Sequence, residues 1–239
     1  MTNVKTEPIE AVLFDWGGTL ATWHDIDLYD VWRSVAALID EARADDLATR
    51  LLEAENSIWR RSRDEHLSST LEEVCLLADV AMTPVALAEY DRRWHPHTEL
   101  APDAIDTLRG LRDRGLKLGV LSNTIWSRQR HEDIFARDGV LELLDGAVYT
   151  SEIPYSKPHP EAFKAALQAV EVAEPARALY VGDRLFDDVW GAQNVGMRAA
   201  HIPHSAIPTE QIGHTEGVPD ATIQNLADLL PLIDTWNAR

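Results

Sequence analysis

The stretch AVLFDWGGTL, residues 11–20, joins a short apolar run to a carboxylate and two glycines. Further apolar runs lie at 116–123, 146–150, 178–183 and 197–203. Continuous apolar runs are typical of strands buried on both faces, whereas strands with one exposed face alternate between apolar and polar residues. The runs therefore predict the strands of a parallel sheet.

Helical patterns separate these runs. The segment 103–115 has apolar residues at helical spacing and ends at Gly115, and the segment 160–170 begins with Pro160 at a plausible first helical position. Alternation of strand and helix predicts an α/β fold, a Rossmann-like doubly wound parallel sheet. The tail, 221–236, is predicted to form a final surface helix.

One long stretch, residues 22–97, breaks the alternation because it contains helical periodicity and no strand-like run. The predicted helices are 28–42, 47–62, 70–80 and 84–94. We expect an all-helical domain inserted after the first strand, with 94–103 as the return linker. The predicted domains are therefore a catalytic core, residues 1–21 and 98–239, and a helical domain, residues 22–97.

Composition limits the classes of partner and compartment. The chain has 239 residues and a net charge of −18, from 22 basic and 40 acidic residues. Such a charge repels phosphate backbones and anionic lipids, so we expect neither a nucleic-acid nor a membrane partner. A single cysteine, Cys75, no signal-peptide pattern and no apolar run near 20 residues indicate a cytoplasmic protein. The oligomeric state is left open.

Polar residues follow each predicted strand, and the carboxyl ends of parallel strands share one edge of a sheet. The residues in question are Asp15, Gly17, Gly18, Thr19, Ser122, Asn123, Lys157, Asp183, Asp187 and Asp188. A carboxylate followed by glycines suits a nucleophile or a metal ligand, and further carboxylates suit Mg²⁺. A hydroxyl and a lysine suit a phosphoryl group in transfer.

These segments resemble the haloacid dehalogenase-like hydrolase superfamily. The four motifs of that family are similar to FDWGGTL (14–20), LSN (121–123), SKP (156–158) and VGDRLFDDVWGAQNVGM (181–197). The resemblance covers essentially the whole chain and gives residues 22–97 the position of the family's helical cap. It implies a Mg²⁺-dependent hydrolase, a phosphoric monoester or acyl phosphate hydrolase, acting on a small phosphorylated metabolite.

The resemblance also implies a role for each motif residue. Asp15 is expected to be the nucleophile that forms an aspartyl-phosphate. The expected metal ligands are Asp15, the carbonyl of Gly17 and Asp183, with Asp188, rather than Asp187, orienting metal-bound water. Lys157 is expected to balance charge, and the phosphoryl oxygens are expected to meet Ser122 and the amide of Asn123. Gly18 and Thr19 complete the expected substrate-binding set.

Gly17 departs from the family pattern, because phosphatases of the family usually carry a second Asp there as general acid and base. General acid–base assistance contributes about 10²–10⁴ in rate. Three explanations stay open. Another residue, such as His24 or His66, could supply the proton; the leaving group could need none, as in an acyl phosphate; or the protein could be a binding or regulatory module without turnover.

Two branches of the family also lack this Asp. The phosphonate-cleaving branch uses a lysine of the cap, but the lysines here are Lys5, Lys117, Lys157 and Lys164, none of them within 22–97. The dehalogenases place a bulky aromatic residue at this position and need no metal, whereas this chain keeps its carboxylates. Another hydrolase of the family remains the alternative.

Several aromatic residues and histidines lie outside the motifs. Trp16 directly follows the expected nucleophile and is predicted to lie beside the site, whereas Trp23, Trp32, Trp59 and Trp94 are predicted to pack helices. His95 and His97 flank Pro96, and a hinge or linker is favoured over a metal pair there.

Overall fold

A computed structural model of the chain describes residues 7–22, 25–203, 214 and 216–238. Its sheet is parallel throughout and has the strand order β3-β2-β1-β4-β5-β6. The strands are β1 (Ala11–Phe14), β2 (Lys117–Ser122), β3 (Gly146–Tyr149), β4 (Ala178–Gly182), β5 (Arg198–His201) and β6 (Ala221–Thr222). The predicted α/β fold with a doubly wound parallel sheet is confirmed, and β6 is an addition that the sequence patterns did not indicate.

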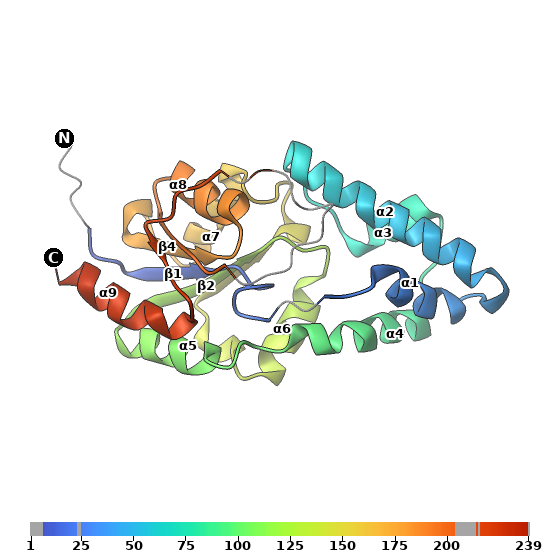
Figure 1. Cartoon of the computed structure of the whole chain (residues 1–239), viewed down its shortest axis with the longest axis horizontal. Coiled ribbons are helices and arrows are strands. Elements are labelled where there is room, and N and C mark those ends of the chain that lie inside the picture. Colours follow the sequence, from blue (N-terminus) through green and yellow to red (C-terminus); the bar gives the residue numbers. More distant parts are fainter. Residues whose placement is uncertain (1–6, 23–24, 204–213, 215, 239) are drawn as a thin grey trace.

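Helices cover both faces of this sheet (Figure 1). In β1, Val12 and Phe14 pack into the core of one face, and Ala11 and Leu13 pack into the core of the other, which explains the continuous apolar run. One face carries α5 (Ala104–Asp113), α6 (Arg128–Arg137) and α9 (Leu229–Asn237), and the other carries α7 (Pro160–Ala169) and α8 (Gly191–Asn194).

Every regular element described between β1 and residue 97 is a helix, and these helices extend to one side of the sheet (Figure 1). They are α1 (Leu28–Ala37), α2 (Ala44–Glu65), α3 (Leu71–Ala78) and α4 (Pro84–Trp94). We refer to residues 25–97 as the helical segment. The side chains of Asp27, Thr70 and Thr83 accept backbone N–H bonds at the starts of α1, α3 and α4. The division into two domains stays a prediction.

The predicted helix at 221–236 is wrong in its first part. β6 occupies Ala221–Thr222, and the α-helix begins only at Leu229. The reason is a capping box at Asn225, in which the Asp228 carboxylate accepts the backbone N–H of Asn225 and fixes a new helical start. α1 is also shorter than predicted, because Asp40 caps a separate short 3₁₀ helix.

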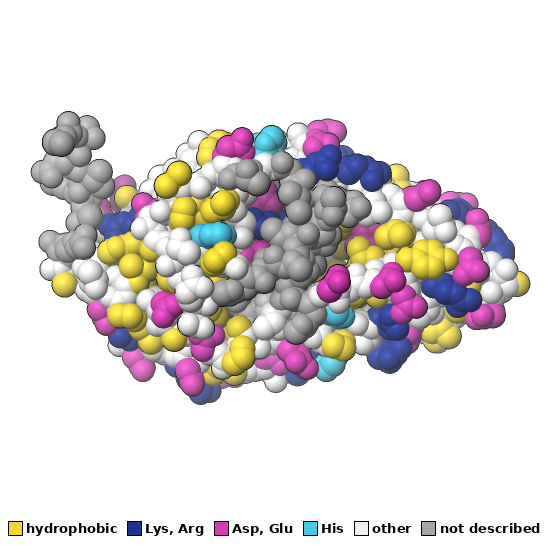
Figure 2. All heavy atoms as spheres, in the orientation of Figure 1, with side chains coloured by type: hydrophobic (Ala, Val, Ile, Leu, Met, Phe, Trp, Pro, Cys, Tyr) yellow, Lys and Arg dark blue, Asp and Glu magenta, His cyan; other side chains and the backbone are white. Residues whose placement is uncertain are grey.

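Charged side chains of both signs cover the molecule. On the face in Figure 2, basic and acidic side chains lie interspersed over the helical segment, so the excess of negative charge does not gather there into one acidic patch. No helix in the described part of the chain combines the length and the apolar character needed to cross a bilayer.

Candidate active site

The site lies where the strand order reverses. β1 pairs with β2 on one side and with β4 on the other, so its carboxyl end opens at the crevice where open α/β sheets bind ligands. Asp15 directly follows β1, and its backbone N–H donates to Val181 O at 2.9 Å. Asp183 directly follows β4. The sheet itself therefore places these two carboxylates side by side.

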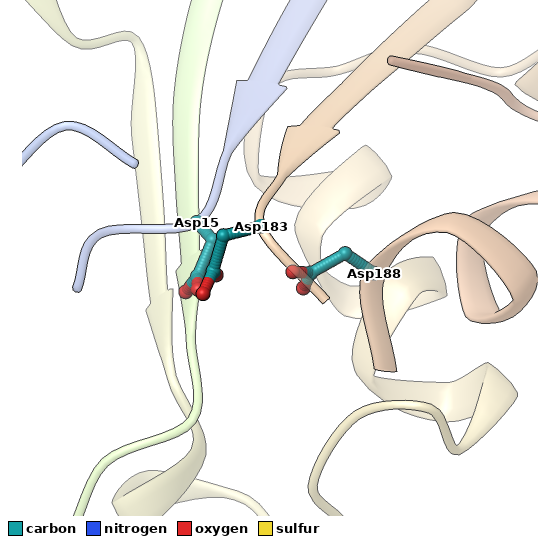
Figure 3. Close-up of side chains that lie close together, drawn as sticks. All are labelled: Asp15, Asp183 and Asp188. Carbon is teal, nitrogen blue, oxygen red and sulfur yellow. The ribbon is translucent and has the colours of Figure 1, made fainter. Parts of the chain in front are cut away.

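Three buried carboxylates meet at this edge. Asp15, Asp183 and Asp188 each offer one oxygen, and these oxygens lie within 4.8 Å of one another. In Figure 3 the carboxylates of Asp15 and Asp183 lie together, and that of Asp188 approaches from the helical turn beyond β4. A Cβ at Gly182 would lie 2.3 Å from the Asp188 carboxylate, so a glycine is required for this close approach.

Lys157 connects two of these carboxylates. Its Nζ lies 2.9 Å from Asp15 Oδ1 and 2.6 Å from Asp188 Oδ1, and it donates to the Tyr180 hydroxyl at 3.0 Å. Burial alone would lower the pKa of Lys157. The charges of Asp15 and Asp188 instead raise this pKa well above its ordinary value. The lysine is therefore a fixed positive charge beside the expected nucleophile.

Asp188, rather than Asp187, joins this cluster. Its Oδ2 accepts the backbone N–H of Arg184 at 2.9 Å, and it is fully buried. Burial raises the pKa of Asp188 to about 6, against the opposing charge of Lys157. Asp187 lines the neighbouring cavity and lies 3.5 Å from the Arg184 guanidinium, and burial raises its pKa also.

The donor set of the cluster fits a hard divalent cation. Carboxylate oxygens are ligands that Mg²⁺ prefers, and three of them converge here with one lysine charge between two of them. Gly17, whose carbonyl is an expected ligand, lies in the cavity wall with Asp15. The ligand assignments themselves stay predictions.

A cavity of about 90 Å³ opens on Asp15. The walls come from the sheet edge and from the helical segment, and the lining residues are Asp15, Trp16, Gly17, Ile26, Leu28, Glu55, Trp59, Tyr90, Trp94, His97, Ser122, Asn123, Thr124, Ile125, Trp126, Lys157, Arg184 and Asp187. The structure thus brings Ser122, Asn123 and Lys157 to Asp15, as the sequence predicted. Such a volume accommodates several water molecules and hence a small ligand.

Two predicted substrate-binding residues lie elsewhere. Gly18 and Thr19 form the turn after Asp15 and are not among the residues that line the cavity. Gly18 has a φ of 86°, which glycine adopts without strain, so a turn requirement explains its place in the sequence. The Thr19 side chain is 3% exposed. Their contact with substrate stays a prediction.

The structure adds residues that the sequence patterns did not assign to a site. Glu55, Tyr90, Trp126, His97 and Arg184 line the cavity. Trp59 and Trp94, predicted as packing residues, line it too. A signal was available for Glu55, because this acid lies on the buried stripe of α2 between Leu51 and Ile58, where an apolar residue is expected.

The histidines that could supply a proton in place of the missing Asp differ in their position relative to the cavity. His24, one candidate, lies outside the described residues. His66, the other, is not among the cavity-lining residues, and its ring lies 6.1 Å from that of Phe186. His97 does line the cavity, in the short 3₁₀ helix that follows α4.

Comparison with known proteins places this geometry in a family. Residues 9–196 match the model of the haloacid dehalogenase-like hydrolases. The chain belongs to this family. A glyceraldehyde 3-phosphate phosphatase of Methanopyrus kandleri is 27% identical over 94% of this chain and 97% of its own length. The mouse haloacid dehalogenase-like hydrolase domain-containing protein 3 is 36% identical over 66% of this chain and 61% of its own length.

Solved structures agree on the fold. A phosphatase of the family from Thermococcus onnurineus superposes with a TM-score of 0.69 at 27% identity, over 94% of this chain and 98% of its own. An L-2-haloacid dehalogenase from Xanthobacter autotrophicus superposes with a TM-score of 0.62 at 21% identity, over 95% of this chain and 98% of its own. The resemblance noted in the sequence is therefore confirmed, and the protein is a hydrolase of this family.

Proposed function

We propose that the protein is a Mg²⁺-dependent phosphatase that hydrolyses a small phosphorylated molecule through a phosphoryl group carried by Asp15. The observation that carries the proposal is the buried Asp15 carboxylate, ion-paired with Lys157 and next to Asp183, at the floor of a cavity that also exposes Ser122. The phosphatase names of relatives that align along nearly their whole length support the same reaction.

Two displacements at phosphorus complete the proposed reaction. An Asp15 oxygen attacks the phosphorus, and the bond from phosphorus to the leaving-group oxygen breaks, with the electron pair going to that oxygen. Water then attacks the phosphorus and gives up a proton to the solvent, the bond to the Asp15 oxygen breaks with its electron pair returning to the carboxylate, and phosphate leaves. Lys157 holds the Asp15 carboxylate, and the Ser122 hydroxyl donates to a phosphoryl oxygen. A bound Mg²⁺ would neutralise phosphoryl charge.

Gly17 limits the leaving groups that depart readily. No carboxylic acid stands at this position to protonate an alkoxide, whereas the carboxylate of an acyl phosphate departs without a proton. We therefore expect acyl phosphates and phosphate esters with acidic leaving groups to react faster than simple alkyl phosphates.

Phosphate release from acetyl phosphate and p-nitrophenyl phosphate, with Mg²⁺ and with a chelator, tests the proposal. We expect metal-dependent release, and acid quenching at short times should give a mass increase of one phosphoryl group. Asp15→Asn should abolish both, and Asp106→Asn, which alters an exposed carboxylate in α5 outside the site, should change neither. Phosphate binding without release would indicate a binding protein, and metal-independent halide release from 2-chloropropionate would indicate a dehalogenase.

A further inference from the structure

Glu55 is a buried acid in the wall of the active-site cavity. It lies in α2 and is 3% exposed. Its Oε2 accepts the indole N–H of Trp32 at 2.6 Å, and its Oε1 accepts that of Trp59 at 3.3 Å. Among the described residues, no lysine, arginine or histidine forms an ion pair with it. Glu55 therefore contributes an unpaired carboxyl group to the place where a substrate binds.

Such a group is costly unless a ligand uses it. A buried carboxylate without a positive partner is strongly disfavoured, and an apolar residue of similar volume would pack at this point of the apolar stripe with less cost. Burial raises the pKa of Glu55, and the two indole hydrogen bonds oppose this. A carboxylate has about four acceptor positions, and two indole donors leave the others available.

The surrounding side chains suit a cation as the missing partner. Trp59, Tyr90, Trp94 and Trp126 line the same cavity as Glu55. Aromatic faces attract ammonium and guanidinium groups. A cation already packs on two of these rings, since the Arg130 guanidinium lies 3.9 Å from the Trp126 ring centroid and 4.9 Å from that of Tyr90. An ammonium group of a ligand would meet a carboxylate and aromatic rings together.

The two walls of the cavity carry different groups. The sheet wall carries two cations, Lys157 and Arg184, and two acids, Asp15 and Asp187. The described lining from the helical segment carries one acid, Glu55, and no lysine or arginine. A molecule with a phosphoryl group and an ammonium group matches both walls. The volume of about 90 Å³ favours a short carbon chain between the two groups.

We propose that the substrate is a small phosphorylated molecule that also carries an ammonium group, and that this ammonium group binds Glu55 and the aromatic rings beside it. This inference rests on the proposed phosphatase activity and adds the substrate class. Glu55 is then a specificity-determining residue that does not touch the phosphoryl group.

Esters that differ only at the end remote from phosphorus test the assignment. We would compare kcat/KM for aminoalkyl phosphates of two to four carbons with the matching alkyl and hydroxyalkyl phosphates. The protein should prefer the amino compounds by about 10- to 100-fold, as expected for a charge-assisted hydrogen bond. Glu55→Gln should remove this preference, and Glu53→Gln, an exposed acid of the same helix, should retain it.

A binding measurement supplies a readout that is independent of turnover. Propylammonium should quench or shift the fluorescence of the cavity tryptophans in the unaltered protein, and 1-butanol at the same concentration should not. Glu55→Gln should lose the response to propylammonium. Since this titration also uses the unaltered protein, it stays informative if the variant does not fold.

The outcomes separate the inference from the proposed function. Release of phosphate without preference for the amino compounds, or a preference that survives Glu55→Gln, overturns the substrate class and leaves the phosphatase standing. A preference for hydroxyalkyl phosphates would indicate that Glu55 is protonated and donates a hydrogen bond. That result also overturns the proposed substrate class. Absence of release from every ester and from acetyl phosphate refutes the phosphatase and the substrate class with it.

Discussion

The side-chain amide of Asn123 holds the backbone of Lys157 through two hydrogen bonds. Asn123 Nδ2 donates to Lys157 O at 3.1 Å, and Lys157 N donates to Asn123 Oδ1 at 2.8 Å. The residue after β2 thereby fixes the segment that carries the lysine, which lies 34 positions further along the chain. The sequence motif assigned only the backbone amide of Asn123 a task, and the structure adds a second one for its side chain.

Asn123→Ala should lower both stability and turnover. Two hydrogen bonds are lost and a partly buried pair of backbone groups is left unsatisfied, so the free energy of unfolding should fall by about 1–3 kcal/mol. Because Lys157 is then less well positioned, kcat should fall by about 10-fold with a smaller change in KM. Urea unfolding and steady-state kinetics measure these effects. Asn194→Ala, at an exposed position of α8, is the control, and an equal loss in both variants would contradict the role of Asn123.

Lys157→Met should destabilise the fold because Asp15 and Asp188 lose the cation between them. Removal of one partner from a buried ion pair costs about 3–5 kcal/mol. Adding Asp188→Asn should recover part of this loss, since one of the uncompensated carboxylates is then neutral. Chemical unfolding of the single and double variants measures the recovery. Lys164→Met, which breaks only an exposed pair with Glu161, should cost less than about 1 kcal/mol.

Gly17→Asp should restore a general acid. The rate on alkyl phosphates should rise by up to about 10²-fold, and the rate on acyl phosphates should hardly change, because a carboxylate leaves without a proton. Positive φ is found at Gly18 and not at Gly17, so the backbone conformation at position 17 does not itself require glycine. Steady-state kinetics with alkyl and acyl phosphates, in the unaltered protein and in Gly17→Asp, measure the two effects. A similar effect on the two would mean that leaving-group protonation is not what the glycine removes.

His131 should make stability depend on pH. It is fully buried, with Nε2 2.9 Å from Thr124 Oγ1, and burial, aided by Arg130 and Arg128, lowers its pKa from 6.5 to about 3. Between these values the unfolded chain binds a proton that the folded chain does not. The stabilising contribution of neutral His131 is therefore present above pH 6.5 and is lost as pH falls toward 3, by up to about 1.4 kcal/mol per pH unit.

His131→Phe should make the fall of stability with acidification less steep. Urea unfolding at several pH values from 7 to 4 gives the slope in each protein. The absolute stability of the variant also changes through the lost Thr124 contact, but only the slope reports the proton. Parallel curves for the protein and His131→Phe would show that His131 is protonated in the folded state too.

Local signals in the sequence predicted where several of the site residues lie. The apolar run before Asp15 and the run before Asp183 require burial on both faces, and parallel pairing of β1 and β4 then brings the two carboxylates together. Lys157 could be placed by its motif. The start of α9 was missed although the Asn225 capping box that fixes the helical start is also a local signal, because a helical pattern that begins earlier competes with it.

The residues of the helical segment that form a cavity wall could not be predicted from local sequence patterns. Tyr90 and Trp94 recur at helical spacing in α4, which predicts burial but not the object against which they pack. Their position in the cavity depends on Trp126, more than thirty residues away, whose indole N–H donates to the Tyr90 hydroxyl at 3.1 Å. Contacts between distant segments are set by tertiary packing, and the sequence of either segment alone does not record them.

The contacts between the helical segment and the rest of the chain are expected to limit turnover. Trp126 is bonded to Tyr90, Ser62 Oγ donates to Ser156 Oγ at 2.8 Å, and Arg130 pairs with Asp91 at 2.5 Å, so each contact joins the helical segment to the rest of the chain. We expect the ligand to enter, and its products to leave, as these contacts break. Turnover on the best substrates should therefore fall as solvent viscosity rises, whereas turnover on poor substrates, limited by bond breaking at phosphorus, should not.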